Sequence, residues 1–428
     1  MKISDLPSKQ SERYLEALRS FEPHQQLLVK VSGSILEDEA DVVELGEAIS
    51  ELAGQGIHAL IIHGGGPQLS HVIEQTGNKP RFIDGIRYTD QFTLELAETT
   101  FNTLTQKLIE SFKRNSIDAV SIPSTKLFKA KRQPEFGYSS SEIEAIDIDT
   151  IVKTLKQHSI LVLNSLASDF DTGKTLNINS DTIFRALAAK IRPHRMVNLT
   201  PTGGVLKASP NNQTPELISG LDIRDVDNLI SEGVVSGGMA LKLRELAQIL
   251  DDLEIGSAVS ITKPADTLIE LLTDQGAGTF VGKGPKIIET SNLSEIMPDL
   301  TRLIKKAFHG TLPEGYEKQP VEKIYFTADH LAFGVVTKLS DGTPYLDKLA
   351  VSPQLQGRGI GESLWYKITS DWPVLMWRSH VTNRYASWYH RHADIMKRHG
   401  EWILFGRGVE FSALESKAEE IIAIPVMH

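Results

Sequence analysis

A glycine-rich segment in the C-terminal third of the chain has the residue pattern of an anion site. The segment YLDKLAVSPQLQGRGIGESLW, residues 345 to 365, reads as a strand, a glycine-rich turn and the start of a helix. Glycines let the backbone approach a pyrophosphate closely, and the first amides of a helix direct free N–H groups towards it. Arg358 adds a positive charge to the turn. The spacing predicts an anion-binding junction, but glycine turns also occur at such junctions for steric reasons alone.

The same turn resembles the Q/R-x-x-G-x-G/A motif of the GNAT superfamily of N-acetyltransferases. In that family the loop binds the pyrophosphate of coenzyme A, and the preceding strand aligns the acetyl group. The resemblance therefore implies that the C-terminal domain uses acetyl-CoA. The residues that match this strand and loop are Leu349, Val351, Gln356, Gly357, Arg358, Gly359 and Gly361.

Four blocks narrow this resemblance. They are YLDKLAVS, QGRGIG, WRSHVTN at residues 377 to 383 and SWYHRH at residues 387 to 392. Together they look like the acetyltransferase domain of vertebrate-type N-acetylglutamate synthase, over most of residues 295 to 410. The resemblance implies that Lys348, Arg378 and Asn383 hold glutamate, and that Tyr389 faces the thioester sulfur.

The chemistry of acetyl transfer to glutamate calls for side chains of these types. A dicarboxylate needs cationic or amide donors, and thioester aminolysis needs a neutral amine and an acid for the departing thiolate. A tyrosine hydroxyl can supply that proton, so we interpret Tyr389 as functional and Trp377 and Trp388 as core aromatic residues on strands. The sequence identifies no general base; His390, His392 and a chain of water molecules are the alternatives.

A second set of glycine turns and lysines occupies the first two thirds of the chain. Its pieces, in order, are KVSG (30–33), HGGGPQ (63–68), GIR (85–87), NINSD (177–181), TPTGG (200–204) and GGMALK (237–242). Together they resemble the amino acid kinase family, and within it the acetylglutamate kinases. The resemblance covers residues 26 to 284. It implies an open αβα sandwich that carries phosphoryl donor and acceptor side by side.

Phosphoryl transfer to a carboxylate requires positioning and charge neutralisation more than covalent help. The resemblance implies that Lys30 and Lys242 neutralise the transferring oxygens, and that Asp181 orients both lysines. Glycine-turn amides would bind oxygens directly. We expect Gly33 and Gly64 on the nucleotide, and Gly65, Gly66, Arg87 and Asn177 on the acetylated amino acid. Magnesium would arrive with ATP and be held chiefly by phosphates, so we expect no protein metal site.

Two departures from the kinase pattern leave alternative functions open. The chain has Ser32 where the family has a glycine, and residues 137 to 144 replace a segment richer in glycine and valine. One hypothesis is a bifunctional enzyme of arginine biosynthesis, which acetylates glutamate and then phosphorylates N-acetylglutamate. A second is a monofunctional synthase whose kinase-like domain binds arginine and supports assembly, since vertebrate relatives keep the fold without the kinase reaction.

Two further hypotheses belong to other classes. One is a protein-lysine acetyltransferase with a small-molecule sensor domain, which the set of Lys348, Arg378 and Asn383 disfavours because it suits a small dicarboxylate. The other is an aspartate or glutamate kinase, which the NINSD and GIR segments disfavour.

The elements that position these motifs follow from apolar periodicity. Before the linker at residues 277 to 295, short apolar runs alternate with helical patterns, which predicts a parallel sheet covered on both faces. The predicted strands are residues 26–35, 58–66, 160–167, 195–200 and 256–262, and the predicted helices are 9–21, 42–56 and 67–77. After the linker, a helix at 296–308 precedes strands at 323–330, 331–340, 343–352, 373–379 and 401–408, with a helix after the glycine turn.

We therefore predict an α/β amino acid kinase fold, an open αβα sandwich, followed by an α+β GNAT-superfamily domain. The predicted boundaries are an N-terminal amphipathic helix in residues 1–25, the kinase domain in 26–285 and the acetyltransferase domain in 286–428. The amphipathic segment at 9–21 is of the kind that docks on a partner or neighbouring subunit.

Composition excludes several functional classes. A net charge of -10 argues against binding nucleic acid, and the absence of cysteine excludes disulfides, thiolate metal sites and cysteine nucleophiles. No run of about 18 apolar residues predicts a membrane span, and no secretory segment opens the sequence, so we expect a cytoplasmic protein. The resemblance implies a homo-oligomer, a tetramer in the family, and an arginine effector site at residues 276–284 near Lys263.

Overall fold

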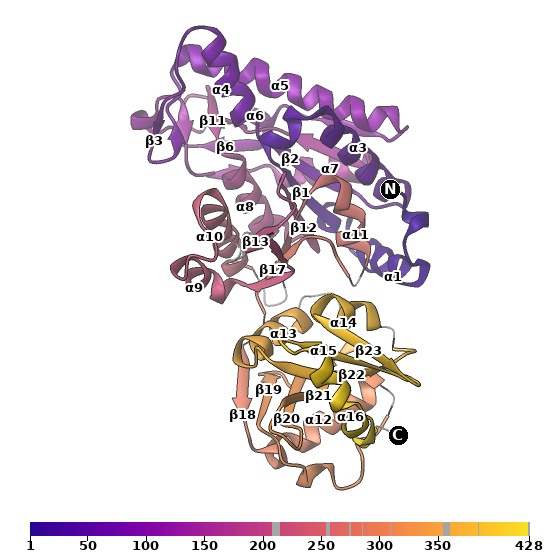
Figure 1. Ribbon diagram of the computed structural model, residues 1–428. Helices are drawn as coiled ribbons and strands as arrows, with labels where there is room; N and C mark the ends of the chain where they lie inside the picture. The colour runs from indigo at the N-terminus through magenta and orange to yellow at the C-terminus, as the bar shows by residue number, and fades with distance from the viewer. Residues whose placement is uncertain are drawn as a thin grey trace. The chain divides into compact units, whose positions relative to one another are not determined.

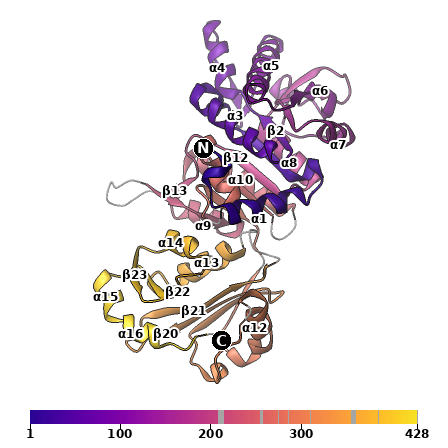
Figure 2. The ribbon, with the colours of Figure 1, turned by 90° about the vertical axis from the view of Figure 1, so that its right-hand side faces the viewer.

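The computed structural model describes residues 1–207, 215–253, 257–273, 275–284, 286–308, 310–353, 360–383 and 385–426. The chain divides into two compact units (Figures 1 and 2). The first unit comprises Met1–Ser219, Ile223–Glu254 and Ala258–Val281, and the second comprises Gly220–Asp222, Ile255–Ser257 and Gly282–His428.

A parallel sheet forms the centre of the first unit. The strand order is β15-β17-β16-β12-β1-β2-β9-β5, of which β15 (Gly220–Asp222) falls among the residues of the second unit. The pairs that join β16, β12, β1, β2, β9 and β5 are parallel. Every residue of β1, β2 and β9 is buried, as expected for a parallel sheet covered on both faces. The strands are β1 (Leu27–Val31), β2 (Ala59–His63), β5 (Ala119–Ser121), β9 (Ile160–Leu163), β12 (Arg195–Leu199), β15 (Gly220–Asp222), β16 (Ala258–Thr262) and β17 (Thr279–Gly282).

Helices cover this sheet, and side-chain caps define several of their first turns. Asp38, Asp90, Asp147 and Asn179 accept backbone N–H groups at the starts of α3, α5, α7 and α8. The helices are α1 (Ser8–Arg19), α2 (Pro23–Gln26), α3 (Glu39–Gly54), α4 (Gly66–Gln75), α5 (Gln91–Arg114), α6 (Ser124–Leu127), α7 (Ile148–Gln157), α8 (Ser180–Ile191), α9 (Val226–Ser231), α10 (Gly237–Asp251) and α11 (Thr267–Leu272).

The predicted N-terminal helix is α1, and its apolar face is already covered. Leu15 and Leu18 are each 1% exposed and belong to the core of the first unit, together with Leu268 of α11. The expectation that this face docks on a partner is therefore wrong for these two leucines, because the helix packs on its own unit.

A second, mixed sheet carries Asn177, one of the residues expected to bind substrate, on strand β11. Its order is β7-β11-β10-β6-β8, and two hairpins, β3–β4 and β13–β14, lie outside it. The run at 160–167, predicted as one strand, breaks at Asn164 and Ser165 into β9 and β10, which lie in different sheets. The strands are β3 (Phe82–Ile83), β4 (Ile86–Arg87), β6 (Phe128–Ala130), β7 (Ser139–Ser140), β8 (Ala145–Ile146), β10 (Leu166–Asp169), β11 (Thr175–Ile178), β13 (Val205–Lys207) and β14 (Glu216–Ile218).

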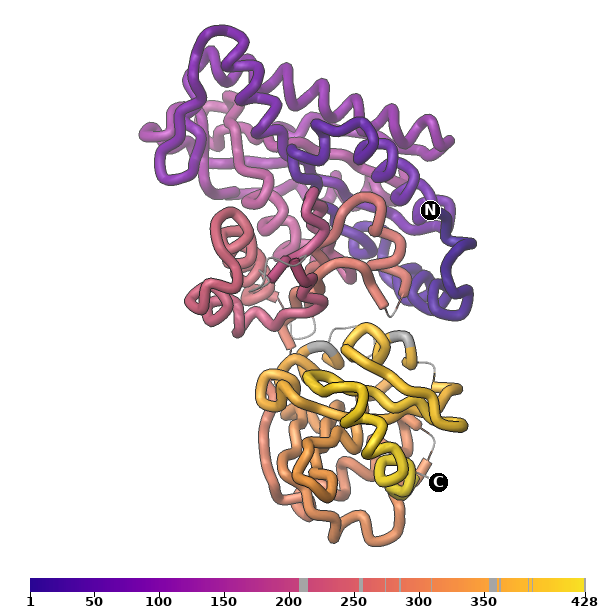
Figure 3. Tube along the Cα trace, viewed as in Figure 1, coloured from indigo at the N-terminus to yellow at the C-terminus, as the bar shows by residue number. Residues whose placement is uncertain are grey.

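The second unit, whose residues from 286 onward are drawn from orange to yellow in Figure 3, contains a seven-stranded sheet. The strand order of this sheet is β18-β19-β20-β21-β22-β24-β23. Its pairs are antiparallel except β21–β22, which is parallel. The strands are β18 (Ile287–Thr290), β19 (Lys323–Thr327), β20 (Ala332–Lys338), β21 (Pro344–Val351), β22 (Leu375–His380), β23 (Ile395–His399) and β24 (Trp402–Arg407). The helices are α12 (Leu293–Phe308), α13 (Ile360–Asp371), α14 (Ala386–His392), α15 (Phe411–Ser416) and α16 (Ala418–Ala423).

Candidate active sites

Lys30 and Asp181 form a buried ion pair in the first unit. Lys30 is the charged residue of β1, where the register pairs it with Ile62 of β2 and Asn198 of β12. Asp181 lies in the first turn of α8, and its amide donates to the capping Asn179 at 3.0 Å. The Nζ of Lys30 is 2.6 Å from Asp181 Oδ1, and the lysine side chain is 5% exposed. Because a lone buried ammonium is costly, the carboxylate is what permits a lysine here.

Lys242 on α10 belongs to the same cluster of charges. Burial, reinforced by the charge of Lys30, lowers the pKa of Lys242 to about 8, while Asp181 and Glu245 oppose the shift. Helix α10 packs against α8, the helix that carries Asp181. The structure thus brings together the two lysines and the aspartate from three motifs that are far apart in sequence.

The two predicted phosphate turns are packed so tightly that a side chain would clash. A Cβ on Gly33 would lie 2.8 Å from Pro67 Cδ, and one on Gly65 would lie 2.7 Å from the Phe101 ring. At Gly64 the nearest atom would be Ser180 Oγ, at 3.0 Å. These glycines let the ends of β1 and β2 and the start of α8 approach one another closely, as a site for phosphate requires.

Ser32, which replaces a family glycine, adopts a conformation open to any residue. Its φ is -63°, and its Oγ lies 3.1 Å from Ser34 Oγ. Its amide donates to the Leu199 carbonyl at 3.2 Å, and the Gly64 amide donates to Val31 at 3.1 Å. We expected the Gly64 amide to bind the nucleotide, but in this structure it joins the ends of β1 and β2 through its bond to Val31.

Arg87 presents an unpartnered donor beside the glycine turn. Its Nη2 donates to the Gly66 carbonyl at 2.9 Å and to Ser70 Oγ at 2.8 Å, whereas its Nη1 is buried without a hydrogen-bond partner. The guanidinium carbon lies 4.7 Å from the centre of the Phe82 ring, and burial lowers the pKa of Arg87. An orphaned, desolvated donor of this kind suits a carboxylate.

Asn177 joins the Arg87 segment through Thr89. The Nδ2 of Asn177 donates to Thr89 Oγ1 at 3.2 Å, and Ser139 donates to Thr89 Oγ1 at 2.8 Å and to the Arg87 carbonyl at 2.9 Å. Ser139 belongs to the segment at 137–144 that departs from the kinase pattern, and here it links the two residues expected to bind substrate.

His63 lies fully buried behind the second glycine turn. Its Nδ1 is 2.9 Å from the Gly64 carbonyl oxygen, and its Nε2 is 2.9 Å from Thr105 Oγ1. Burial lowers the pKa of His63 to about 4, so the ring is neutral at physiological pH. The neutral ring thus stabilises the second glycine turn through its contacts with Gly64 and Thr105.

In the second unit, β21 and β22 pair at one position among the described residues, Tyr345 with Met376. β21 continues for six residues beyond Tyr345, to Val351, and the whole strand pairs with β20 on its other side. The predicted acetyl-CoA residues Leu349 and Val351 lie on this part of β21. The edge of β21 that faces β22 is thus where a ligand would meet them.

A β-bulge places Lys348 beside Asp347. Val335 pairs with Lys348 and Val336 with Leu346, which leaves Asp347 as the extra residue. The Nζ of Lys348 is 2.8 Å from Asp347 Oδ1, and the two side chains are 8% and 2% exposed. The pair is buried, so Lys348, which is predicted to bind glutamate, already has a counter-ion within the protein.

Tyr316 completes this pair. Its hydroxyl donates to Asp347 Oδ2 at 2.6 Å, and the Nζ of Lys348 lies 5.2 Å from the centre of its ring. Burial, followed by the charge of Asp347, raises the pKa of Tyr316, so the phenol stays protonated. Both oxygens of Asp347 are therefore engaged.

Arg378 contacts the C-terminal segment of its own chain. Its Nη1 donates to the carbonyls of Ile421 and Ile422, the latter at 2.7 Å, and its Nη2 donates to the carbonyl of Ile424. The guanidinium carbon lies 4.3 Å from the centre of the Trp402 ring. These carbonyls lie at the end of α16, where helix carbonyls lack intrahelical partners. Arg378, expected to hold glutamate, caps this helix in the structure.

Asn383 and Tyr389 lie on the segment that follows β22. The Nδ2 of Asn383 donates to Ser379 Oγ at 2.8 Å, and its Oδ1 accepts the Tyr385 amide at 3.0 Å. Burial raises the pKa of Tyr389 to about 12. Burial raises the pKa of Tyr345, the charge of Arg378 opposes this shift, and Asp347 and Tyr389 add to it.

The aromatic residues around Tyr389 only partly match the expectation. Trp377 is 1% exposed on β22, which confirms it as a core residue. Trp388 and Tyr389 lie on the short helix α14 and not on a strand, with their rings 5.3 Å apart. Of the possible bases, His390 is exposed, and His392 is buried against Trp388.

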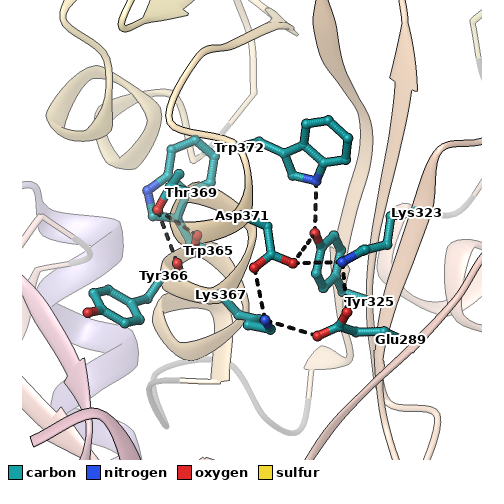
Figure 4. Close-up of polar contacts among 9 residues, drawn as sticks. All are labelled: Glu289, Lys323, Tyr325, Trp365, Tyr366, Lys367, Thr369, Asp371 and Trp372. Carbon is teal, nitrogen blue, oxygen red and sulfur yellow. Dashed lines mark hydrogen bonds and ion pairs between the residues drawn. The ribbon is translucent and has the colours of Figure 1, made fainter. Parts of the chain in front are cut away.

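Helix α13, which follows the predicted phosphate turn, is tied to the sheet by a network of charges (Figure 4). Lys323 and Lys367 both bridge Glu289 and Asp371, at distances from 2.8 to 3.0 Å. The Tyr325 hydroxyl donates to Asp371 Oδ2 at 2.8 Å. Hydrogen bonds from Lys323 and Lys367 lower the pKa of Glu289. The network joins β18 and β19 to the C-terminal end of α13 and orients the helix.

The turn itself is described only at its end. Gln356, Gly357, Arg358 and Gly359 lie outside the described residues. Gly361 lies in the first turn of α13, where a Cβ would be 3.8 Å from Val351 Cγ2. The last motif glycine thus faces the end of β21.

Two charged residues at these sites were missed by the sequence analysis. Asp347 stood inside the YLDK block, but only the bulge reveals that it faces Lys348. Glu245 follows Lys242 by three residues, which places both on one side of a helix. That spacing was the available signal.

Among the described residues, no group of three or more His, Cys, Asp or Glu side chains is arranged to hold a metal ion. Nor does any helix in the described ranges have the length and apolar character to cross a membrane.

Comparison with known proteins identifies both units. The Amino acid kinase family matches residues 25–259, more than half of the chain. The chain belongs to the amino acid kinase family. A second family, the N-acetyltransferase of N-acetylglutamate synthase, matches residues 288–423. This member of the kinase family therefore carries an acetyltransferase domain after its kinase domain, which confirms the predicted fold class.

Individual relatives support the same assignment. Acetylglutamate kinase of Xylella fastidiosa is 32% identical over 406 residues, 94% of each chain. Mitochondrial N-acetylglutamate synthase of Danio rerio is 29% identical over 322 residues, 73% of this chain and 60% of that one. The resemblance to N-acetylglutamate synthase/kinases is thus confirmed. The protein is a transferase of arginine biosynthesis with kinase and acetyltransferase domains.

Two solved structures share the fold. Both are of N-acetylglutamate synthase from Neisseria gonorrhoeae, one complexed with coenzyme A and N-acetyl-glutamate and the other with coenzyme A and L-arginine. Their sequence identities are 18% and 19%, and their TM-scores are 0.60 and 0.57. They cover 96% and 94% of this chain, and the matches span 96% and 98% of those chains.

Proposed function

We propose that the protein is a bifunctional N-acetylglutamate synthase/kinase. Its C-terminal domain would convert acetyl-CoA and L-glutamate to N-acetyl-L-glutamate and CoA, and its kinase domain would then phosphorylate N-acetylglutamate with ATP. The observation that carries the kinase half is the buried Lys30–Asp181 pair at 2.6 Å, with Lys242 in the same charge cluster. Similarity to acetylglutamate kinases over nearly the whole chain supports it.

In the kinase reaction, a carboxylate oxygen of N-acetylglutamate attacks the γ-phosphorus of ATP, and the bond to the ADP oxygen breaks. Lys30 and Lys242 would neutralise the transferring oxygens, and Asp181 would orient Lys30 through their ion pair. Arg87 would use its unpartnered Nη1 for a substrate carboxylate, with Asn177 beside it. Magnesium would come with the nucleotide.

In the synthase reaction, the neutral α-amine attacks the thioester carbon, and the C–S bond breaks. The departing thiolate takes a proton, for which Tyr389 is the proposed acid. Its raised pKa, about 12, keeps the phenol protonated at neutral pH, as an acid requires. Lys348, Arg378 and Asn383 remain the proposed glutamate ligands, on β21, β22 and the turn after β22.

An arginine effector is part of the proposal. The candidate turn at 276–284 is shaped by Glu270, whose Oε2 accepts the amides of Ala277 and Gly278 at 2.8 Å each. The Neisseria synthase complexed with L-arginine supports an effector for this chain. Steady-state assays of both activities with and without arginine test it, and no effect on either would refute it. The tetramer and the cytoplasmic location stay predictions.

The decisive experiment supplies the full chain with N-acetylglutamate, ATP and Mg²⁺ and traps the acylphosphate with hydroxylamine. We expect a hydroxamate signal that Lys30→Ala and Lys242→Ala variants lose, while glutamate acetylation continues in both. A silent wild type that still acetylates glutamate would favour the monofunctional synthase. One observation favours the monofunctional synthase. The Gly64 amide, which would bind the nucleotide in a working kinase, donates instead to the Val31 carbonyl.

The acetyl acceptor that the enzyme uses distinguishes an N-acetylglutamate synthase from a protein-lysine acetyltransferase. A lysine peptide and glutamate are offered separately, and release of CoA is followed with each. Discharge with the peptide alone would point to a protein-lysine acetyltransferase.

A further inference from the structure

Asp347 and Lys348 are consecutive residues of β21, yet both side chains contact Tyr316. The Tyr316 hydroxyl donates to Asp347 Oδ2 at 2.6 Å, and the Nζ of Lys348 lies 5.2 Å from the centre of the Tyr316 ring. Consecutive side chains of a regular strand point to opposite faces of the sheet, so one tyrosine could not contact both. The β-bulge, which leaves Asp347 as the extra residue, removes this alternation. The bulge therefore directs both charged side chains to the side of the sheet on which Tyr316 lies.

Tyr316 is held in place by packing. It begins a short 3-10 helix, Tyr316–Lys318, that contacts α12. Its side chain is buried in a cluster that includes Leu300 of α12 and Phe333 of β20. A buried tyrosine hydroxyl needs a hydrogen-bond partner, and the Asp347 carboxylate provides it. Because apolar contacts fix the ring, its hydroxyl can hold that carboxylate in one position.

The Lys348 ammonium group is bound by two acceptors that both belong to Asp347. Its Nζ donates to Asp347 Oδ1 at 2.8 Å and to the Asp347 carbonyl at 3.3 Å. An ammonium group has three N–H donors, so these bonds leave one N–H of Lys348 without an acceptor among the residues that the structure describes. That donor is available for a carboxylate of the substrate, and the other two bonds set its direction.

The same contacts indicate the role of Asp347. Each of its side-chain oxygens accepts a hydrogen bond, Oδ1 from Lys348 and Oδ2 from Tyr316. Hydrogen bonds and a neighbouring ammonium group stabilise the charged form of a carboxylate, so this one is poorly suited to take a proton from the attacking amine. A buried ammonium group, in turn, needs an anion beside it. Asp347 therefore suits the role of a counter-ion that holds Lys348 and not that of the general base.

We propose that Tyr316 and Asp347 are positioning residues of the synthase site, which hold the Lys348 ammonium group so that one N–H is directed at a carboxylate of glutamate. This inference rests on the proposed function, because it takes Lys348 to be a glutamate ligand. It adds that the affinity for glutamate depends on the hydrogen bond from the Tyr316 hydroxyl to Asp347.

The first experiment compares the steady-state kinetics of the full wild-type chain with those of Tyr316→Phe. The substitution removes the hydroxyl group and keeps the ring and its apolar packing. Without this hydrogen bond, Asp347 and Lys348 can turn away from the substrate. We expect the KM for glutamate to rise about ten-fold, with kcat and the KM for acetyl-CoA close to their wild-type values. An unchanged KM for glutamate would overturn the proposal, and so would an equal rise in both KM values, which would indicate a general loosening of the domain.

Tyr325→Phe is the matched control. Tyr325 is also buried, and its hydroxyl donates to Asp371 at 2.8 Å (Figure 4). Asp371 pairs with Lys323 and Lys367, neither of which is proposed to bind glutamate. The variant removes the same kind of hydrogen bond from the same domain, so its KM for glutamate should stay at the wild-type value. A rise as large as that in Tyr316→Phe would assign the effect to lost stability and contradict the proposal.

The second experiment tests whether Tyr316 acts through Lys348. The double variant Lys348→Met with Asp347→Asn removes the cation and its counter-ion together, so neither charge is left buried alone. If Tyr316 acts by positioning Lys348, addition of Tyr316→Phe to this double variant should change kcat/KM for glutamate by less than about two-fold. A further loss of about ten-fold would show that the hydroxyl group acts independently of Lys348 and would refute the positioning role.

The wild-type chain separates this inference from the proposed function. If it does not acetylate glutamate, the proposed synthase is refuted, and the role of Tyr316 and Asp347 is refuted with it. If it acetylates glutamate and Tyr316→Phe keeps the wild-type KM for glutamate, the synthase stands and only the positioning role is refuted.

Discussion

The two candidate sites differ in how their predicted residues find partners. In the kinase domain, Lys30 pairs with Asp181, and both belong to the predicted set. In the acetyltransferase domain, Lys348 pairs with Asp347, and Arg378 binds carbonyls of the C-terminal segment, none of them predicted. The reason lies in the charges. The residues predicted for the kinase site include an anion, Asp181, which pairs with Lys30. Those predicted for the synthase site are two cations and an amide that suit a dicarboxylate substrate, and in this structure the two cations bind oxygen atoms of the chain itself.

The largest expected effect comes from breaking the pair in the kinase domain. Asp181→Ala leaves Lys30 buried without its anion, which should cost about 3–5 kcal/mol of unfolding free energy and abolish hydroxamate formation. The double variant Lys30→Met with Asp181→Ala should recover most of the stability but none of the kinase activity. Chemical denaturation followed with a probe in the first unit measures this. Equal stability of the single and double variants would contradict the internal pairing.

The next effect belongs to the synthase. Tyr389→Phe removes the proposed acid while keeping the ring that packs near Trp377 and Phe405. We expect glutamate acetylation to fall by about 10²- to 10³-fold, with hydroxamate formation unchanged. Phe405→Leu, which alters the same packing without touching the hydroxyl group, is the control. A Tyr389→Phe enzyme as fast as wild type would remove Tyr389 from the mechanism.

A third prediction concerns acid stability of the kinase domain. His63 has a pKa of about 4 in the folded chain and about 6.5 in the unfolded chain. Between these two pH values the unfolded state binds a proton on His63 and the folded state does not, so the folded state loses stability as pH falls. The stability that the neutral ring provides is complete above pH 6.5 and is lost as pH falls towards 4. The loss should be on the order of 3 kcal/mol. His63→Gln should flatten this part of the pH profile in urea unfolding experiments, and a persistent slope would assign it to other groups.

The sequence was informative where packing or charge leaves a periodic or paired signal. The buried apolar runs of β1 and β2 predicted the parallel sheet, and the resemblance to the kinase family implied that Asp181 orients Lys30, a residue 151 positions away in the sequence. It failed where one position breaks a pattern. Asn164 and Ser165 divide an apolar run into strands of different sheets, because Ser165 donates to the His63 carbonyl and the Asn164 amide donates to Ser124.

Other residues carried no readable signal at all. The residue types of β21 give no sign of the bulge at Asp347. The bulge nevertheless determines that Lys348 pairs with Asp347. The partners of Arg378 are backbone carbonyls, which every residue possesses, so residue types cannot reveal them. A site described by side chains alone therefore omits contacts that compete with the substrate.

The smallest expected effect tests that competition directly. We expect Arg378 to bind glutamate through Nη2, which would then compete with the bond from Nη2 to the carbonyl of Ile424. Truncation after Ala423 removes this acceptor and keeps α16, so it should lower the KM for glutamate by roughly two- to five-fold, because one net hydrogen bond is no longer lost on binding. Truncation after Val426 leaves all three carbonyls and is the matched control. A raised KM with the shorter chain would mean that the segment helps to build the glutamate site, and the carbonyls would then position Arg378 for its substrate.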